Sequence, residues 1–490
     1  MAELLRGTDH RLLSFLPQIG TDAKASRPPP LDQFVGEVYD YTNDRNLTLR
    51  GRMRDPDNVS VEESNRQPLP SDDEFQAAVQ VLREDHDMAA QVRRENLVPY
   101  QPMPPLIATE SVAGDVSRVI AVGLVGEDEL ARQRIVGIRM KDRRIIRDVP
   151  GVVQTFSGSC GPTPASCGQS GNTGQAWITV KRGSTTLWRF LAIRPAASSG
   201  TNGSGIELRY VDYRGKRVLY QAHVPILNIL YDPSGPGGCG PTYRDWQNGE
   251  TCFQADGVDV ATGFRLCAAP AQTILDSGVD GGNFRGVAIY VQGEEVVLVS
   301  QMQAGWYRYI TEWRLAADGT IRPRFGFSAT DNGCTCHLHT HHVYWRLDFD
   351  IVTATNNMVE EYNNPPLFPP HHWHKKLYEI RRLRDFARHR HWRVTNATRH
   401  KGYEIIPGAA DGTSDTYGLG DVWVLRYHPG EIDDGQGFTT VPGLSMEHID
   451  KFLTGETVLD QDVVLWYAAH FRHDPAHAVG EWVGPELKPI

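Results

Sequence analysis

Short segments of alternating apolar and polar residues, separated by turns rich in glycine, proline and asparagine, run from about residue 151 to the end of the chain. Examples are LWRFLAI at 187–193, EEVVLVSQ at 294–301 and DVWVLRY at 421–427. A period of two places apolar side chains on one face of a strand, which suits sheets that pack face to face. The pattern therefore predicts a mainly β protein in which residues 151–490 form a large antiparallel β-sandwich.

Two smaller regions precede the predicted sandwich. Residues 1–70 are polar, contain the proline clusters RPPP and QPLP and show no sustained period, so we expect an extended N-terminal arm. Ser71 and Glu74 form a capping box ahead of an amphipathic helix, and two β-rich runs, SRVIAVGLVG and ARQRIVGIRMKDRRIIRDV, follow it. These signals predict a small α+β domain over residues 71–150.

The charge balance narrows the range of partners. The chain has 50 Lys and Arg residues against 60 Asp and Glu residues, and its net charge is -10. It therefore lacks the basic excess of proteins that bind nucleic acid or anionic membranes. Neither a signal peptide nor an 18-residue apolar run is visible. We expect a soluble, cytoplasmic protein that binds neither nucleic acid nor membrane; secretion by another route and the pairing of the seven cysteines stay open.

The densest group of chemically active side chains lies in CTCHLHTHHVYWRLDFD, residues 334–350. Side chains at positions i and i+2 of a strand project from the same face, so His339 and His341 can bind one metal ion together. Two histidines on an exposed strand are commonly just solvated, and a metal site needs a third ligand. The downstream segment WYAAHFRHDPAHAV offers three further histidines, and the spacing does not choose among them.

At these residues the sequence resembles the copper- and topaquinone-containing amine oxidases. Their copper strand reads H-x-H, then an aromatic-rich stretch, then R-L-D-x-D, as does the segment from His339 to Asp350. Their third copper histidine follows a V-L-W segment and precedes a proline by two residues, which matches His473. The resemblance implies Cu(II) bound by His339, His341 and His473, a nitrogen-rich ligand set that suits this ion.

The resemblance also implies a redox cofactor made from the chain itself. In the family, the tyrosine of T-x-x-N-Y-(D/E) is converted to topaquinone, and Tyr307 in QAGWYRY aligns with this tyrosine. Trp306 and Arg308 stand where the family has asparagine and an acidic residue. Without the resemblance, Tyr307 and Tyr309 on one face of an alternating strand would be interpreted as ordinary core.

Two more residues of the oxidation site follow from the same alignment. Tyr231 matches the tyrosine that hydrogen-bonds the quinone oxygen. Asp245 matches the catalytic base that takes a proton from the amine. An aspartate in a loop rich in glycine and proline is by itself more often a turn former. Burial beside an apolar channel would raise the pKa of Asp245 towards neutrality, as proton abstraction at neutral pH requires.

A second, calcium-like metal site is implied as well. In the family, both aspartates of R-L-D-x-D and an aspartate eleven residues before the third copper histidine bind this ion, together with backbone carbonyl groups. The counterparts are Asp348, Phe349, Asp350, Asp462 and Val463. Hard oxygen ligands of this kind suit Ca²⁺. The alternative is an acidic strand edge that holds no ion.

The family's chemistry implies a copper-dependent oxidation of a small primary amine by O₂ to an aldehyde, ammonia and hydrogen peroxide. The altered residues beside Tyr307 keep two alternatives open. One is a copper-binding pseudoenzyme with an unmodified Tyr307, and the other is a copper oxidase that uses no quinone. Because the sandwiches of the family pair extensively, we also expect a homodimer.

Overall fold

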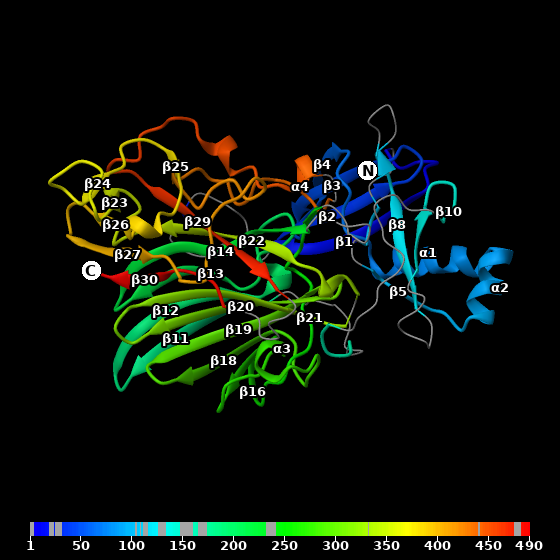
Figure 1. The fold of residues 1–490 in the computed structure, drawn as a ribbon, viewed down its shortest axis with the longest axis horizontal. Coiled ribbons are helices and arrows are strands. Elements are labelled where there is room, and N and C mark those ends of the chain that lie inside the picture. Colours follow the sequence, from blue (N-terminus) through cyan, green and yellow to red (C-terminus); the bar gives the residue numbers. More distant parts are fainter. Residues whose placement is uncertain are drawn as a thin grey trace.

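The structure is a computed structural model that describes residues 4–18, 24, 32–102, 105–107, 109–110, 116–125, 134–147, 160–164, 174–231, 242–331, 333–439, 442–474 and 482–490. Strands dominate this part of the chain and form two large sheets and three small ones. Figure 1 shows the large sheets on one side of the molecule, with the N-terminal elements beside them. The predicted fold class, mainly β with a large antiparallel sandwich, is confirmed.

The N-terminal part of the chain forms a four-stranded antiparallel sheet, where the sequence predicts an extended arm. Its strands lie in chain order: β1 (His10–Gln18), β2 (Gln33–Asp40), β3 (Arg45–Arg52) and β4 (Asp55–Ser64). The sheet buries a small apolar cluster that includes Phe34, Val38, Leu47 and Leu49, while β4 is largely exposed. Buried polar residues such as Glu37, Asn46 and Thr48 interrupt the apolar alternation of these strands. The expectation of an arm over residues 1–70 is corrected.

Two helices and a second small sheet follow. The elements are α1 (Asp72–Glu84), α2 (His86–Arg94) and, in sheet order, β10 (Arg144–Ile146), β9 (Arg134–Arg139), β8 (Val119–Val125) and β5 (Val98–Tyr100). The Ser71 side chain accepts a hydrogen bond of 3.1 Å from the Glu74 backbone N–H, so the predicted helix start is confirmed. Phe75, Val79 and Leu82 are buried on α1, as their spacing predicts. The domain limits at residues 70 and 150 stay predictions.

The first large sheet has nine strands in the described part of the chain, and β15 (Thr242–Arg244) pairs at its side with β14. The other strands, in sheet order, are β11 (Gln175–Arg182), β12 (Thr185–Ile193), β13 (Glu207–Tyr213), β14 (Lys216–Tyr231), β22 (His339–Phe349), β29 (Val463–His473), β28 (Val422–Arg426) and β25 (Ile380–Arg382). Strands β14, β22 and β29 are therefore direct neighbours although they are far apart in sequence.

The second large sheet has eleven strands among the described residues. In sheet order these are β16 (Gly257–Ala261), β17 (Phe264–Cys267), β18 (Val287–Gln292), β19 (Glu295–Ala304), β20 (Tyr307–Ala316), β21 (Ile321–Ala329), β30 (Glu486–Pro489), β27 (Lys401–Ile406), β26 (His391–Asn396), β23 (Asn357–Tyr362) and β24 (Trp373–Lys375). Its pairs are antiparallel, apart from β17 with β18.

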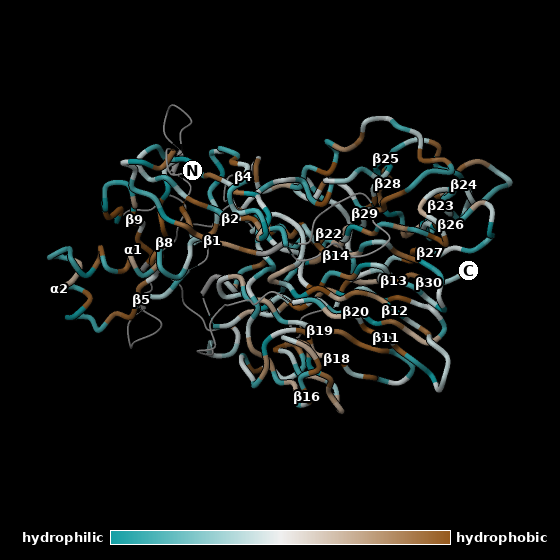
Figure 2. The backbone as a smooth tube through the Cα atoms, turned by 180° about the vertical axis from the view of Figure 1, so that it is seen from behind, coloured by the Kyte–Doolittle hydropathy of each residue, from teal (hydrophilic) through white to brown (hydrophobic). Residues whose placement is uncertain are grey.

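One continuous core joins the two large sheets. Leu219 and Leu347 of the nine-stranded sheet belong to the same buried apolar cluster as Leu298 and Ile321 of the eleven-stranded sheet. Figure 2 shows hydrophobic segments along the strands of the sandwich, whereas α2 is hydrophilic and buries only Met88. Side chains that point inward from either large sheet consequently meet in a space that is largely closed to water.

The remaining elements are short. They are β6 (Thr109–Glu110), β7 (Val116–Ser117), α3 (Ile274–Ser277), α4 (Pro442–Ser445) and the 3₁₀ turns η1 (Pro195–Ala197), η2 (Gly333–Cys336), η3 (Phe386–Arg388) and η4 (Ile449–Phe452). A disulfide joins Cys160 to Cys336, and the thiol of Cys267 is free and buried. Among the described residues, the helices are too short or too polar to cross a membrane.

Candidate active site

The candidate redox residues meet between the two large sheets. Strand register places Tyr231 of β14 opposite His339 of β22, and His339 opposite His473 of β29, so these three residues form one row across the nine-stranded sheet. Tyr307 begins β20 in the facing sheet, and its hydroxyl lies 3.1 Å from His339 Nε2. The fold therefore brings four of the predicted site residues, from four strands, to one point in the core.

The three predicted copper ligands lie side by side. The ring centroid of His339 is 4.8 Å from that of His341 and 4.5 Å from that of His473, and the Nδ1 atoms of His339 and His473 are 3.4 Å apart. Both ring nitrogens of His341 are buried and lack a hydrogen-bond partner within the described part of the chain. Buried unpartnered nitrogens are costly unless something binds them, so His341 is suited to bind a metal ion, although the ligand nitrogens of the three histidines do not all lie within 4.8 Å of one another here.

Electrostatics favours the neutral form of these imidazoles, which is the form that binds a metal. Burial lowers the pKa of His339 and of His341 well below its usual value, and the neighbouring histidines lower it further. Burial likewise lowers the pKa of His473 to about 4. The His339 Nδ1–H donates to the carbonyl oxygen of His337 at 2.7 Å, because a carbonyl only accepts. Nε2 of His339 thus keeps its lone pair, directed at the Tyr307 hydroxyl.

The other candidates for the third ligand do not approach this group in the described structure. His470 belongs to the same strand as His473 but contacts His342, with their Nδ1 atoms 2.7 Å apart. His342 follows His341 directly, so it projects from the opposite face of β22. His477 lies outside the described residues. Among the described histidines of the C-terminal segment, His473 is therefore the one beside His339.

Tyr307 is completely buried and held on several sides. Its hydroxyl contacts the hydroxyl of Tyr231 as well as His339, as the alignment of Tyr231 implies. Its ring stacks on Tyr309 at 5.5 Å between centroids and meets the edge of Trp306 at 6.1 Å. Burial raises the pKa of Tyr307 well above its usual value, so the phenol is neutral in this environment.

Arg308, one of the two departures from the family pattern, makes its contacts away from the phenol of Tyr307. Its guanidinium forms a two-pronged ion pair with Asp280, with both N–O distances 2.8 Å. It also donates to the backbone carbonyl oxygens of Gly305 and Tyr307. A strand alternates its side chains, so Tyr307 and Tyr309 share one face and Arg308 has the other. The positive charge is neutralised on that other face.

Asp245 follows β15 directly and is buried. Its Oδ2 accepts a hydrogen bond from the Tyr309 hydroxyl, while its buried Oδ1 has no partner among the described residues. Burial raises the pKa of Asp245 well above its usual value, and the hydrogen bond from Tyr309 partly opposes this shift. The carboxyl group thus has the raised proton affinity that the sequence predicts, with one free oxygen.

Sequence reasoning missed the aromatic residues that complete this site. Tyr309 links the ring of Tyr307 to Asp245, although a tyrosine two positions along a strand is usually interpreted as core. Phe327 of β21 lies 3.8 Å from His341 between ring centroids, and Phe471 of β29 stacks on the same histidine at 5.6 Å. The two-residue spacing from Tyr307 to Tyr309 and from Phe471 to His473 is the signal that could have found two of them.

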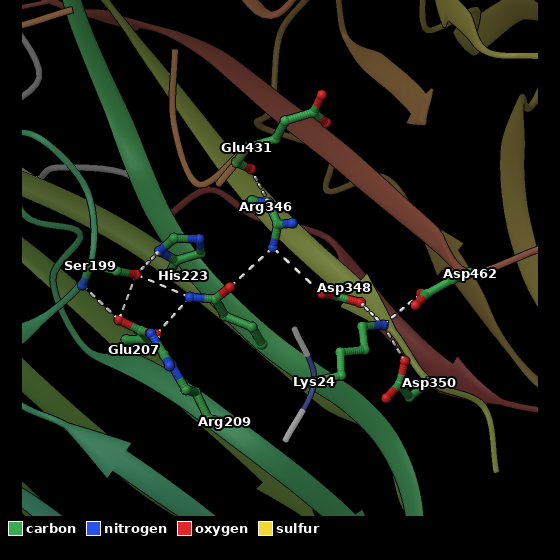
Figure 3. Close-up of polar contacts among 11 residues, drawn as sticks. Lys24, Ser199, Glu207, Arg209, His223, Arg346, Asp348, Asp350, Glu431 and Asp462 are labelled. Atoms are coloured by element: carbon green, nitrogen blue, oxygen red, sulfur yellow. Dashed lines mark hydrogen bonds and ion pairs between the residues drawn. The ribbon is translucent and has the colours of Figure 1, made fainter. Parts of the chain in front are cut away.

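The residues of the predicted calcium-like site also come together, but around a different cation. Carboxylate oxygens of Asp348, Asp350 and Asp462 lie within 4.8 Å of one another. The ammonium group of Lys24 lies among them, as Figure 3 shows. Phe349 and Val463 face each other across β22 and β29, with buried side chains. The cluster of carboxylates is as expected, and its positive charge comes from the chain itself.

Comparison of the sequence with known families agrees with the residues at this site. Residues 283–478 match the sequence model of a family described as copper amine oxidase, enzyme domain. This segment contains Tyr307 and the three histidines, whereas Tyr231 and Asp245 lie before it. No curated protein matches the sequence.

Several solved structures share the fold. A copper-containing benzylamine oxidase from Hansenula polymorpha superposes with a TM-score of 0.63 and 13% identity, covering 95% of this chain and 89% of that one. An amine oxidase from Aspergillus nidulans gives 0.58 and 15%, with coverages of 100% and 86%. A lysyl oxidase from Pichia pastoris gives 0.59 and 12%, with coverages of 99% and 85%.

At such low identities these likenesses show the fold alone: the chain is an amine-oxidase-like β-sandwich protein. Its segment 283–478 matches the sequence model of the copper amine oxidase family, so the resemblance seen in the sequence motifs is confirmed.

Proposed function

We propose that this protein is a copper-dependent oxidase of small primary amines. The overall reaction takes an amine R–CH₂–NH₂, O₂ and water to an aldehyde, ammonia and hydrogen peroxide, which balances in atoms and electrons. The observation that carries the proposal is the buried contact of the Tyr307 hydroxyl with both Tyr231 and His339, next to the unpartnered nitrogens of His341. A tyrosine beside a cluster of neutral imidazoles is what conversion of the phenol by copper and oxygen requires.

His339, His341 and His473 would hold copper, since their imidazoles are adjacent and neutral. Bound copper and a quinone formed from Tyr307 would supply the redox chemistry, which oxidises the amine by two electrons and passes the electrons to O₂. Tyr231 holds the hydroxyl oxygen of Tyr307 in position, and Tyr309 stacks on the ring of Tyr307. Phe327 and Phe471 pack against His341 and keep water from the histidines.

Asp245 is the proposed base. Its free Oδ1 accepts the proton from the carbon next to the amino group, while the Tyr309 hydroxyl holds Oδ2. A carboxylate with a raised pKa is a stronger base than an exposed one, and the site raises the pKa through burial.

A copper-binding protein with an unmodified Tyr307 is the second candidate. It is favoured by Trp306, which packs its edge against Tyr307 at 6.1 Å where the family has a smaller polar residue. The two candidates differ in one activity. The copper-loaded oxidase releases hydrogen peroxide when a primary amine is added in air, and Asp245→Ala abolishes this release; the pseudoenzyme releases none with any amine.

The homodimer is part of the same proposal and rests on the family resemblance. Light scattering is expected to give about twice the chain mass of 54.7 kDa. A monomer at micromolar concentration would contradict it.

A further inference from the structure

Lys24 lies in the connection between β1 and β2, far in sequence from the sandwich it contacts. Its Nζ is 2.7 Å from Asp348 Oδ1, 2.5 Å from Asp350 Oδ1 and 2.5 Å from Asp462 Oδ1 (Figure 3). An ammonium group has three N–H donors. Each of the three carboxylates takes one, so the donors of Lys24 and the three acidic side chains match in number.

Two aromatic rings complete the surroundings of this ammonium group. Nζ lies 4.4 Å from the ring centroid of Tyr427 and 5.4 Å from that of Tyr220. Ring faces attract a cation, and they suit an ammonium group that is already hydrogen-bonded on its other side. Ca²⁺ instead needs six to eight oxygen ligands, and ring faces offer none. The surroundings therefore fit an amine better than a divalent ion.

We propose that Lys24 is the built-in cation of this site, so that the chain binds no calcium there. Lys24, which lies between β1 and β2 in the sequence, contacts the sandwich at the end of strands β22 and β29. Asp350 follows β22 directly, and Asp462 directly precedes β29. Lys24 thus clamps the two strands that carry the three copper-ligand histidines at their opposite ends.

The charges around Lys24 explain why the cluster needs a cation. Burial alone would lower the pKa of Lys24, but the three carboxylates outweigh it and raise the pKa above its usual value. Asp348 also faces Arg346, with Nη1 3.7 Å from its Oδ2. Arg346 in turn donates to Gln221, which leads into the polar network of Glu207 drawn in Figure 3. Without Lys24, the three carboxylates would keep, within the described part of the chain, only the weaker attraction of Arg346 on Asp348 and of Arg217 on Asp350.

The contacts of Lys24 lie at the opposite end of β22 and β29 from the three histidines proposed to bind copper. β22 and β29 pair without irregularity from His339 opposite His473 to Phe349 opposite Val463. Ten residues of extended chain at about 3.4 Å each separate the two ends by roughly 34 Å. Loss of Lys24 is therefore expected to change stability and cation binding at its own end, and to leave copper binding intact.

The first test compares Lys24→Met, which keeps the aliphatic stem, with the wild type and with Lys181→Met. Lys181 is exposed on β11 and serves as the matched control. Each protein is freed of loosely bound metal, then analysed for bound calcium and for thermal unfolding with and without calcium chloride. We expect no bound calcium and no calcium-dependent change in Tm for the wild type and the control. For Lys24→Met we expect a lower Tm, because the three carboxylates lose their buried cation.

Calcium bound by the wild type at about one per chain, with a higher Tm, would overturn the proposal. So would a Lys24→Met protein that unfolds at the wild-type temperature without calcium. If this variant does not fold, the wild-type measurement decides alone.

A second test needs no variant. Reagents that modify amines attack the neutral form, so an ion-paired and caged lysine reacts slowly. On the intact protein, peptide mass spectrometry is expected to show Lys24 modified more than about tenfold more slowly than Lys181, because each unit of raised pKa lowers the neutral fraction tenfold. Equal rates at the two lysines would contradict the contacts of Lys24 and overturn the proposal.

Discussion

The β22–β29 strand pair has a cluster of buried polar side chains at each end, and the two clusters differ in how their polar atoms are satisfied. At one end, His339, His341 and His473 are neutral, and His341 leaves both nitrogens without a partner in the described structure. At the other end, the ammonium group of Lys24 donates to Asp348, Asp350 and Asp462. The difference teaches that burial alone does not mark a metal site. We propose an external ion where the ligand atoms are unpartnered, and none where the chain supplies its own cation.

Loss of a histidine at the first end is expected to have the largest effect. His473→Ala leaves two imidazoles, and bound copper should fall from about one per chain to nearly none. His371→Ala is the control, because this histidine is exposed in another region. Metal analysis after dialysis measures the change. Wild-type copper content in His473→Ala would show that this histidine is not a ligand.

Asp245→Asn is expected to remove catalysis while leaving the metal in place. The amide cannot take the proton, so amine-dependent peroxide release should fall about 100- to 10,000-fold, with unchanged copper content. Asp259→Asn, an exposed aspartate on β16, serves as the control. Retention of more than a tenth of the wild-type rate in Asp245→Asn would assign the proton transfer to another group.

Lys24→Met tests whether the two ends of the strand pair are independent, because it should affect the Lys24 end alone. Removal of one partner from a buried ion cluster costs about 3 kcal/mol of unfolding free energy. Copper content should stay at the wild-type value, because the strand pair keeps its register between the two ends. Denaturant unfolding and metal analysis on the same sample check both statements. A parallel loss of copper would mean that the two ends are coupled.

The smallest predicted effect concerns the pH dependence of the base. The hydrogen bond from Tyr309 lowers the pKa of Asp245, whereas burial raises it. The carboxylate form accepts the proton, so the oxidation rate rises with pH through this pKa. In Tyr309→Phe the pKa rises further, and the rising limb of the profile should move to higher pH by about one unit. Tyr378→Phe, at an exposed position, should not move it. A shift to lower pH would contradict the assignment.

The sequence predicts much of the histidine site at one end of the β22–β29 pair and little of the Lys24 site at the other end. The H-x-H pair is a local pattern, because strand alternation places its two side chains on one face. His473 was identified through the resemblance to the family, and so were the three aspartates. Lys24 was not, because 324 to 438 residues separate it from them and no local pattern surrounds it. Only folding shows which lysine of the chain comes near those carboxylates.

The N-terminal region shows a similar limit of prediction from sequence, here for the fold. Alternation over long strands predicts the sandwich, because each strand buries several side chains. Strands β2 and β3 of the N-terminal sheet also bury residues, but several of these are polar, Glu37, Asn46 and Thr48 among them, so apolar alternation is weak there. Its strands are stabilised by pairing with one another, which leaves little trace in composition. Tyr309 was missed for a related reason: a buried tyrosine looks the same in a core and in an active site.

The central claim is that Tyr307, beside the three histidines, becomes a redox cofactor. The most direct measurement loads metal-free protein with copper in air, records its visible absorption and determines the mass of the peptide that contains Tyr307. The account predicts a visible quinone band and a modified Tyr307 in the wild type, and neither in Tyr307→Phe or His473→Ala. A wild-type protein that binds about one copper per chain, stays colourless in the quinone region and keeps an unmodified Tyr307 would contradict it.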